Sequence, residues 1–242
     1  ENPRTYWFTG NLEYLVSKYN IESYQWLEVH LYYDHPVDQF LIKAVHPITD
    51  TLMQTAISNN FHFIRYEEKG NHIRLRIQAL KGLLHQIIQP NLSEHFEGFF
   101  QRNPSERQVP CEECLPDNSM HYFPYQQEED RFGGPIGQAL ADKQFGLSSS
   151  LVLRIMKNNQ NYWTYEKALS TALQLNLGFI KAVGFNRKEG SRFFQDFSRT
   201  WMKKSDTYRD RPQLLQSFEK GFETKKEALV QQIHQNWQTL ES

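Results

Sequence analysis

Three side chains at alternate positions are the clearest candidates for chemistry in this sequence. His72, Arg74 and Arg76 are spaced two residues apart, and side chains at that spacing project from one face of a β-strand. Such a row of basic groups repels itself unless an anion lies between them, and arginine holds a carboxylate or a phosphate through two parallel hydrogen bonds. The spacing therefore predicts an anion site. The alternative is a half-exposed strand face whose charges pair with Glu67 and Glu68.

The two cysteines, Cys111 and Cys114, have the spacing of half a zinc ribbon. A structural zinc site needs four ligands, and the sequence holds no second cysteine pair, although His95 or His121 could contribute. A redox pair at this spacing normally opens a helix after a strand, whereas these cysteines lie among acidic residues and prolines. We therefore expect two free thiols in a loop and no metal site.

The charges of the chain balance as a whole but not along its length. Its 27 Lys and Arg residues face 28 Asp and Glu residues, for a net charge of −1, which argues against a general polyanion binder. Residues 111–131 hold six acids and one base, whereas residues 181–211 hold nine bases and four acids. The basic segment would suit an acidic peptide or RNA, and a solvated helix face is the alternative.

The elements that must position the hairpin residues alternate between strand and helix in the first half of the chain. The hydrophobic pattern predicts strands over 25–33, 61–66, 72–77 and 120–125, and helices over 11–16, 37–59 and 80–100. Strands 61–66 and 72–77 form a hairpin with Gly70 in its turn. Pro47 and Pro90 are expected to kink or restart their helices. The order β-α-β-β-α-β matches the split βαβ arrangement.

The second half of the chain is predicted to be helical. The turn Gly133-Gly134-Pro135 opens a helix, because proline suits the first helical turn. Helical patterns cover 136–157, 165–184, 188–204 and 212–240. The fold class is therefore α+β: an N-terminal split βαβ (ferredoxin-like) sheet with helices, followed by a mostly helical half. We treat 1–242 as a single domain with a sheet-containing part, 1–130, and a helical part, 131–242.

Composition and motifs exclude several classes of protein. An aromatic content of 14% supplies enough rings for a core, which excludes intrinsic disorder. No apolar run approaches 18 residues, so we expect no membrane span. The sequence contains no phosphate-binding loop, dinucleotide fingerprint, Ser-His-Asp signature or His-Glu-x-x-His zinc motif.

Two segments resemble a known family. Residues 63–66, Phe-Ile-Arg-Tyr, followed by His-Ile-Arg-Leu-Arg at 72–76, resemble the hairpin of the lantibiotic-dehydratase C-terminal domain, also called the thiopeptide-type bacteriocin biosynthesis domain. Members of that family show an Arg-Tyr strand and then a His-x-Arg-x-Arg strand. Arg-Phe-Gly-Gly at 131–134 is similar to the family's Arg-Tyr-Gly-Gly, and residues 26–32 fit its start. These matches occur in the family's order over most of the chain.

The resemblance implies maturation of a ribosomally made peptide by glutamate elimination. In the family, Ser or Thr side chains are first glutamylated from glutamyl-tRNA by a separate, larger domain. This domain then expels glutamate to leave dehydroalanine or dehydrobutyrine. The reaction needs a base for the α-proton, stabilisation of the enolate and a grip on the leaving carboxylate. It needs no cofactor and no metal.

The same resemblance assigns roles to residues. It implies that the catalytic residues are Arg74, Arg76, His234 and His72, and that Arg65, Tyr66 and Arg131 bind substrate. The arginines would hold the carboxylate and the enolate, with His234 or His72 as proton carrier. The family's histidine lies in a His-Met-x-x-Asn-Arg motif, whereas His234 lacks the Met, Asn and Arg. A polar position on an amphipathic terminal helix is the alternative for His234.

The length of the chain leaves no room for the glutamylation domain, so we expect a stand-alone or split subunit. Its expected partners are a precursor peptide and a separate glutamyl-tRNA-dependent glutamylation protein, with a homodimer as one assembly state. Two other functions fit the resemblance. One is a pyridine synthase, which joins two dehydroalanines in a formal [4+2] cycloaddition and depends mainly on holding its substrate. The other is a non-catalytic subunit that binds a leader peptide. Two free thiols and no export signal favour the cytoplasm.

Overall fold

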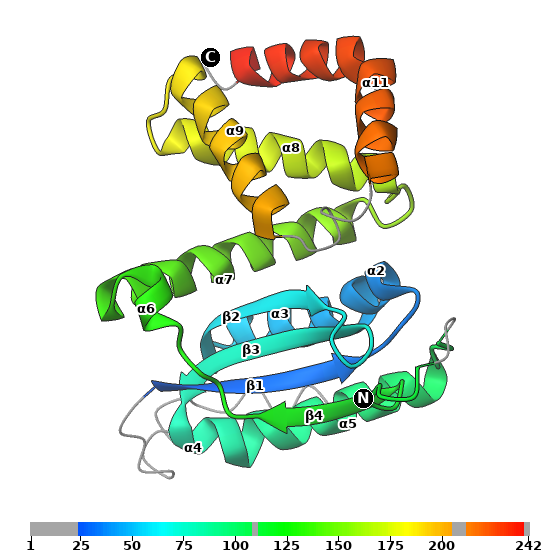
Figure 1. Cartoon of the computed structure of the whole chain (residues 1–242). Coiled ribbons are helices and arrows are strands. Elements are labelled where there is room, and N and C mark those ends of the chain that lie inside the picture. The colour runs from blue at the N-terminus through cyan, green and yellow to red at the C-terminus, as the bar shows by residue number, and fades with distance from the viewer. Residues whose placement is uncertain (1–23, 108–110, 205–211, 240–242) are drawn as a thin grey trace. The chain divides into compact units, whose positions relative to one another are not determined.

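The computed structural model describes residues 24–107, 111–204 and 212–239 (Figure 1). The chain forms two compact units, Glu1–Asn161 and Tyr162–Ser242, and each is described by itself. The predicted helix over 11–16 lies outside the described residues. The first unit extends to Asn161, because the long helix after the glycine turn packs on the sheet of this unit. A single domain over 1–242 stays a prediction.

The first unit is built on an antiparallel sheet of four strands. The strands are β1 (Tyr24–Tyr32), β2 (Ser58–Tyr66), β3 (His72–Leu80) and β4 (Ser119–Phe123), in the spatial order β2-β3-β1-β4 (Figure 1). With a helical segment between β1 and β2 and another between β3 and β4, this is the predicted split βαβ arrangement. The α+β fold class is confirmed.

Helices cover one face of the sheet. The first helical segment runs α2 (Val37–Phe40), the π-helical turn η2 (Leu41–Val45) and α3 (His46–Gln54), and the second runs α4 (Lys81–Leu83), the π-helical turn η3 (Leu84–Ile88) and α5 (Gln89–Arg102). Pro47 and Pro90 each occupy the first turn of the α-helix that follows a π turn. Proline lacks the N–H that an α-helix needs and its ring crowds the preceding turn, so the backbone restarts there after a wider turn, as predicted.

The core lies between these helices and one face of the strands. Alternate strand residues point into it, and they are fully or almost fully buried: Val29, Leu31, Ile73, Leu75 and Ile77. Phe40 stacks on Tyr33, with ring centroids 4.6 Å apart, and its ring lies 5.9 Å from that of Phe96. Because strand residues alternate between faces, the polar residues between these apolar ones are left on the other face of the sheet.

The β2 edge of the sheet is packed by a long helix. After α6 (Glu129–Phe132), a short helix that the sequence pattern did not predict, Gly133 and Gly134 adopt φ values of +79° and +94°, and α7 (Pro135–Asn158) begins. Figure 1 shows α7 beside β2. The Asn60 amide donates to the Asp142 carbonyl at 2.9 Å. A Cβ on Gly146 would lie 1.8 Å from Oδ1 of Asn60, so a larger residue would force the Asn60 side chain or α7 to shift.

The second unit is helical, as predicted. It contains α8 (Tyr165–Ala182), α9 (Arg187–Lys204) and α11 (Pro212–Thr239). The Thr164 side chain accepts a hydrogen bond from the Lys167 N–H at 3.3 Å and so caps the start of α8. Beyond the end of α8, Gly184 takes a φ of +90°. Each helix begins and ends within about three residues of its predicted limits.

The expectation of two free thiols is wrong, because Cys111 and Cys114 form a disulfide. A turn places their Cα atoms 5.4 Å apart, which is within disulfide range. The loop that carries the disulfide is held to the hairpin turn, because the Leu115 N–H donates to the Lys69 carbonyl at 2.9 Å. The thiols therefore no longer support a cytoplasmic location. Within the described residues, no helix has the length and apolar character needed to span a membrane.

Candidate functional site

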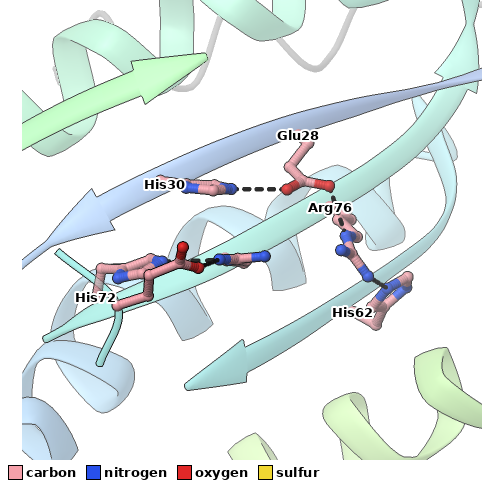
Figure 2. A network of polar contacts seen from close by, with 7 residues as sticks. Glu28, His30, His62, His72 and Arg76 are labelled. Carbon is pink, nitrogen blue, oxygen red and sulfur yellow. Dashed lines mark hydrogen bonds and ion pairs between the residues drawn. The ribbon is translucent and has the colours of Figure 1, made fainter. Parts of the chain in front are cut away.

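The polar face of the sheet gathers ionisable side chains from three strands. In the register of the antiparallel pairs, Glu28 of β1 lies opposite Arg76 of β3, and His30 lies opposite Arg74. His62 of β2 lies opposite Arg76 on its other side. Antiparallel partners stand close enough for their side chains to touch. Figure 2 shows Glu28, His30, His62 and Arg76 joined by dashed lines across the three strands.

Arg76 is held on two sides by residues of the protein. Its Nε donates to Oε2 of Glu28 at 2.7 Å, and its Nη1 donates to Nε2 of His62 at 3.3 Å. The second oxygen of Glu28 accepts a hydrogen bond from Nε2 of His30 at 2.6 Å. The side chains of Arg76 and Glu28 are only 11% and 7% exposed. The anion that the arginine row requires is therefore in part Glu28, which the sequence analysis did not identify.

The pKa values of this network follow from burial and from its partners. Burial alone would raise the pKa of Glu28, but the hydrogen bonds from His30 and Arg76 and the Arg76 charge outweigh burial, so that the pKa is lowered. Burial, together with the positive charge of Arg76, lowers the pKa of His62 to about 4. The network therefore contains an ionised glutamate, a charged arginine and a neutral His62 near pH 7.

His72 is a buried imidazole with a fixed orientation. Its Nδ1 donates to the Gly70 carbonyl at 2.8 Å, and its Nε2 accepts from Nε of Arg74 at 3.2 Å. These bonds select the neutral form with the proton on Nδ1. Its ring stacks on Tyr32 and His30 at centroid distances of 4.6 and 5.0 Å. Burial lowers its pKa, although the Gly70 bond acts in the opposite direction.

Arg74 differs from Arg76 because its acidic partner is exposed. Its Nη2 donates to Oε2 of Glu68 at 3.1 Å, and the exposed fractions are 19% for the Arg74 side chain and 69% for Glu68. The guanidinium carbon lies 3.6 Å from the centre of the Tyr66 ring, which is a cation–π geometry. Two interpretations of the arginine row follow from the sequence, an anion site or pairing with Glu67 and Glu68. For Arg74, pairing with Glu68 is what the structure shows, so Arg74 holds the carboxylate of a glutamate side chain.

Two residues expected to bind substrate form ion pairs outside this network, although Arg131 lies near enough to Tyr66 for an electrostatic interaction. Arg65 points to the opposite face of the sheet, as its cross-strand partner Ile73 does, and forms an ion pair with Asp38 at the start of α2. Arg131 lies on α6, exposed and paired with Glu128 at 2.6 Å. The structure therefore brings Tyr66, His72, Arg74 and Arg76 to one sheet face and Arg65 to the other. The binding roles of Arg65 and Arg131 stay predictions.

Residues 125–142 contribute further polar side chains beside Arg76 that the sequence analysis missed, namely Tyr125, Gln138 and Asp142. The Tyr125 ring lies 4.8 Å from the guanidinium carbon of Arg76 and 5.4 Å from the ring of Trp26. Burial and the nearby Asp142 charge raise the pKa of Tyr125 to about 12. Gln138 donates to Oδ1 of Asp142 at 2.8 Å, and burial raises the pKa of Asp142. Because these residues follow Arg76 by 49 to 66 positions, no local pattern indicated them.

His234 belongs to the second unit, on α11. It is exposed, and its described partner is Arg187 at the start of α9, whose Nη2 lies 2.5 Å from Nδ1 and 3.0 Å from Nε2. Across the described ranges, no group of three or more His, Cys, Asp and Glu side chains is placed to hold a metal ion.

Three solved structures are similar to this chain. A pyridine synthase, TbtD, from thiomuracin biosynthesis has a TM-score of 0.69 at 14% identity, over 90% of this chain and 74% of that one. TsrL has a TM-score of 0.61 at 14% identity, over 91% of this chain and 61% of that one. The tRNA-dependent lantibiotic dehydratase MibB from Microbispora sp. 107891 has a TM-score of 0.52 at 19% identity, over 66% of this chain and 14% of that one.

Identities this low establish the common fold alone, and the chain spans less than two thirds of TsrL and about a seventh of MibB. No curated protein matches the sequence. The family described as "Lantibiotic biosynthesis dehydratase C-term" matches residues 26–242, nearly the whole chain. The chain therefore belongs to the C-terminal family of lantibiotic biosynthesis dehydratases, and so to enzymes that mature ribosomally made peptides.

Proposed function

We propose that this protein eliminates glutamate from glutamylated Ser or Thr residues of a precursor peptide, as a stand-alone or split dehydratase subunit. The observation that carries the proposal is the Arg74–Glu68 pair. In this pair, the carboxylate of the largely exposed Glu68 accepts a hydrogen bond from the guanidinium of the largely buried Arg74. A glutamyl group esterified to a peptide hydroxyl ends in the same side-chain carboxylate. Glu68 thus marks the position that the substrate's glutamyl group takes when it displaces Glu68 from Arg74.

The elimination assigns one step to each neighbouring residue. Nε2 of His72 carries the lone pair that removes the α-proton, once Arg74 has moved from it to the substrate carboxylate. The electrons of the Cα–H bond pass into the enolate and then form the Cα=Cβ double bond, while the Cβ–O bond breaks and its electron pair leaves on the ester oxygen, which becomes the second carboxylate of the released glutamate. Glu28 and His62 engage Nε and Nη1 of Arg76, which leaves Nη2 for the enolate oxygen. His234 is the alternative proton carrier.

The test is an elimination assay on a glutamylated precursor peptide, read by intact mass. Arg74→Ala is expected to lower the rate by about 100-fold or more, because it removes the group that holds the side-chain carboxylate of the departing glutamate, and to retain peptide binding. Lys226→Ala is the control, because Lys226 is an exposed residue of α11 that pairs with Glu223 of the same helix. Full activity in Arg74→Ala would reject the proposal.

Pyridine synthesis is the second candidate, favoured by the similarity to TbtD over 90% of this chain. A cycloaddition depends on holding two dehydroalanines in a reactive arrangement, and it needs no free carboxylate-binding arginine. If the protein is a pyridine synthase, a glutamylated peptide should remain unchanged in the assay. A dehydrated peptide should instead form a macrocycle and release its leader. Binding of the precursor without any change in mass would leave the non-catalytic leader-binding role.

The partners follow from the proposed reaction. Related dehydratases act with a precursor peptide and partner proteins, and we propose the same for this chain, with a separate glutamyl-tRNA-dependent protein supplying the glutamylated substrate. We place the reaction in the cytoplasm, because the precursor peptide is synthesised there. A homodimer stays a prediction.

A further inference from the structure

A pocket of about 490 Å³ lies in the second unit, away from the hairpin residues in sequence. The end of α8, the start of α9 and the end of α11 contribute its lining. Three of the lining side chains are basic, namely Lys181, Arg187 and His234, and Trp237 forms an apolar part of the wall. Segments about 50 residues apart thus bring basic groups together around one hollow of the surface.

The two strongest bases of this pocket have no acidic partner among the described residues, where no Asp or Glu forms an ion pair with Lys181 or Arg187. The Nζ atom of Lys181 is buried and has no hydrogen-bond partner; the centre of the Trp237 ring lies 5.8 Å from it. Arg187 donates to the His234 imidazole, which supplies no negative charge. A buried ammonium without a partner is costly, unlike the exposed cations of α9 such as Arg199, which pairs with Asp196.

We propose that this pocket binds a small oxyanion, a carboxylate or a phosphate, between the Lys181 ammonium and the Arg187 guanidinium. Arginine presents paired N–H donors that match either anion, and the lysine adds a point charge. Trp237 lies beside the anion and contacts the carbon part of the ligand. All the residues of this site belong to the second unit, and the proposal does not depend on the proposed elimination.

The test is calorimetric titration of the full chain with sodium glutamate and, separately, with inorganic phosphate. Lys181→Met and Arg187→Gln are each expected to weaken binding by about tenfold or more, and added salt to weaken it further. Arg199→Gln is the matched control on the same helix as Arg187 and should bind within about twofold of wild type. Binding of glutamate identifies a carboxylate ligand and binding of phosphate identifies a phosphate ligand, and either outcome supports the pocket.

A second measurement separates lost binding from lost folding. Because Lys181→Met removes an unpartnered buried charge, the ligand-free variant is expected to unfold at the same or a higher temperature than wild type, and added anion should no longer raise its Tm. Arg74→Ala should bind the anion as wild type does. No binding of either anion, or glutamate binding that is lost in Arg74→Ala and kept in Lys181→Met, would overturn the proposal.

Discussion

Arg74 and Arg76 have the same chemistry and the same strand face but different partners. Glu28 and His62 hold Arg76 within a buried network, whereas Arg74 contacts the exposed Glu68 and the Tyr66 ring. Arg76 is therefore fixed by the protein on two sides, whereas the acidic partner of Arg74 is exposed. In the proposed elimination, Arg74 is for this reason the arginine that exchanges its carboxylate for one from a substrate.

The spacing of the hairpin predicted which face these residues share, but not their partners. Alternation alone places His72, Arg74 and Arg76 on one side of β3. Glu28 lies 48 positions from Arg76 in the sequence, on a strand that pairs with β3 only because of the order of the strands in the sheet. The local hydrophobic pattern does not predict that order. Arg65 is a different case, because it is adjacent to Tyr66 and alternation alone sends the two side chains to opposite faces, with Arg65 beside Ile73 in register.

His62 is expected to make the stability of the first unit depend on pH. The folded protein protonates His62 only near pH 4, whereas the unfolded chain does so near 6.5. Between these two pH values the unfolded chain binds more protons than the folded protein. The contribution of His62 to the free energy of unfolding is therefore complete above pH 6.5 and is lost as the pH falls. The expected loss between pH 7 and pH 5 is about 2 kcal/mol. Urea unfolding at the two pH values measures this.

Two variants isolate that effect. His62→Phe should reduce the pH dependence over this range, because a group whose pKa differs strongly between the two states is gone. His85→Gln, at an exposed position on η3, should keep it. A pH dependence that is unchanged in His62→Phe would contradict the assignment.

At the scale of elements, the local pattern predicted most helices and strands. Their packing depends on contacts between segments that lie far apart in the sequence, which a local pattern does not show. Pro47 and Pro90 marked the restarts correctly, although the π turns before them carry no sequence signal. α6 was missed because four residues are too few to show a helical period. The packing of α7 on β2 rests on a glycine that, by sequence alone, is only a weak helix former.

Gly146→Ala is expected to destabilise the first unit by about 2 kcal/mol, because the added methyl would overlap Oδ1 of Asn60. Gly178→Ala is the matched control, since it lies inside α8 and a methyl group added there would meet no heavy atom within 4 Å. That control should stabilise its unit by about 1 kcal/mol through helix propensity. Thermal or urea unfolding measures both, and equal effects of the two substitutions would disprove the close contact.

At the scale of the whole molecule, the chain divides after Asn161 into a sheet-containing unit and a helical unit. The sequence predicted a break between helices over 157–165, where Asn and Gln residues cluster, but offered no reason to rank it above the change from predicted strands to predicted helices near residue 130. What decides the boundary is that α7 packs its buried face on β2, through the contacts of Asn60 and Ser149.

The two units are expected to unfold in separate transitions in differential scanning calorimetry. Gly146→Ala should lower the Tm of one transition, and Gly178→Ala should raise that of the other, because each residue packs within its own unit. A single transition that both substitutions shift would show that the units unfold together.

The disulfide between Cys111 and Cys114 carries a consequence for how related chains diverge. Loss of either cysteine alone would leave a single thiol on a surface loop, since Cys111 is exposed and Cys114 half-buried, and an accessible thiol can cross-link two copies of a chain. Chains that share this loop should therefore inherit both cysteines or neither, so that the two positions vary as a pair.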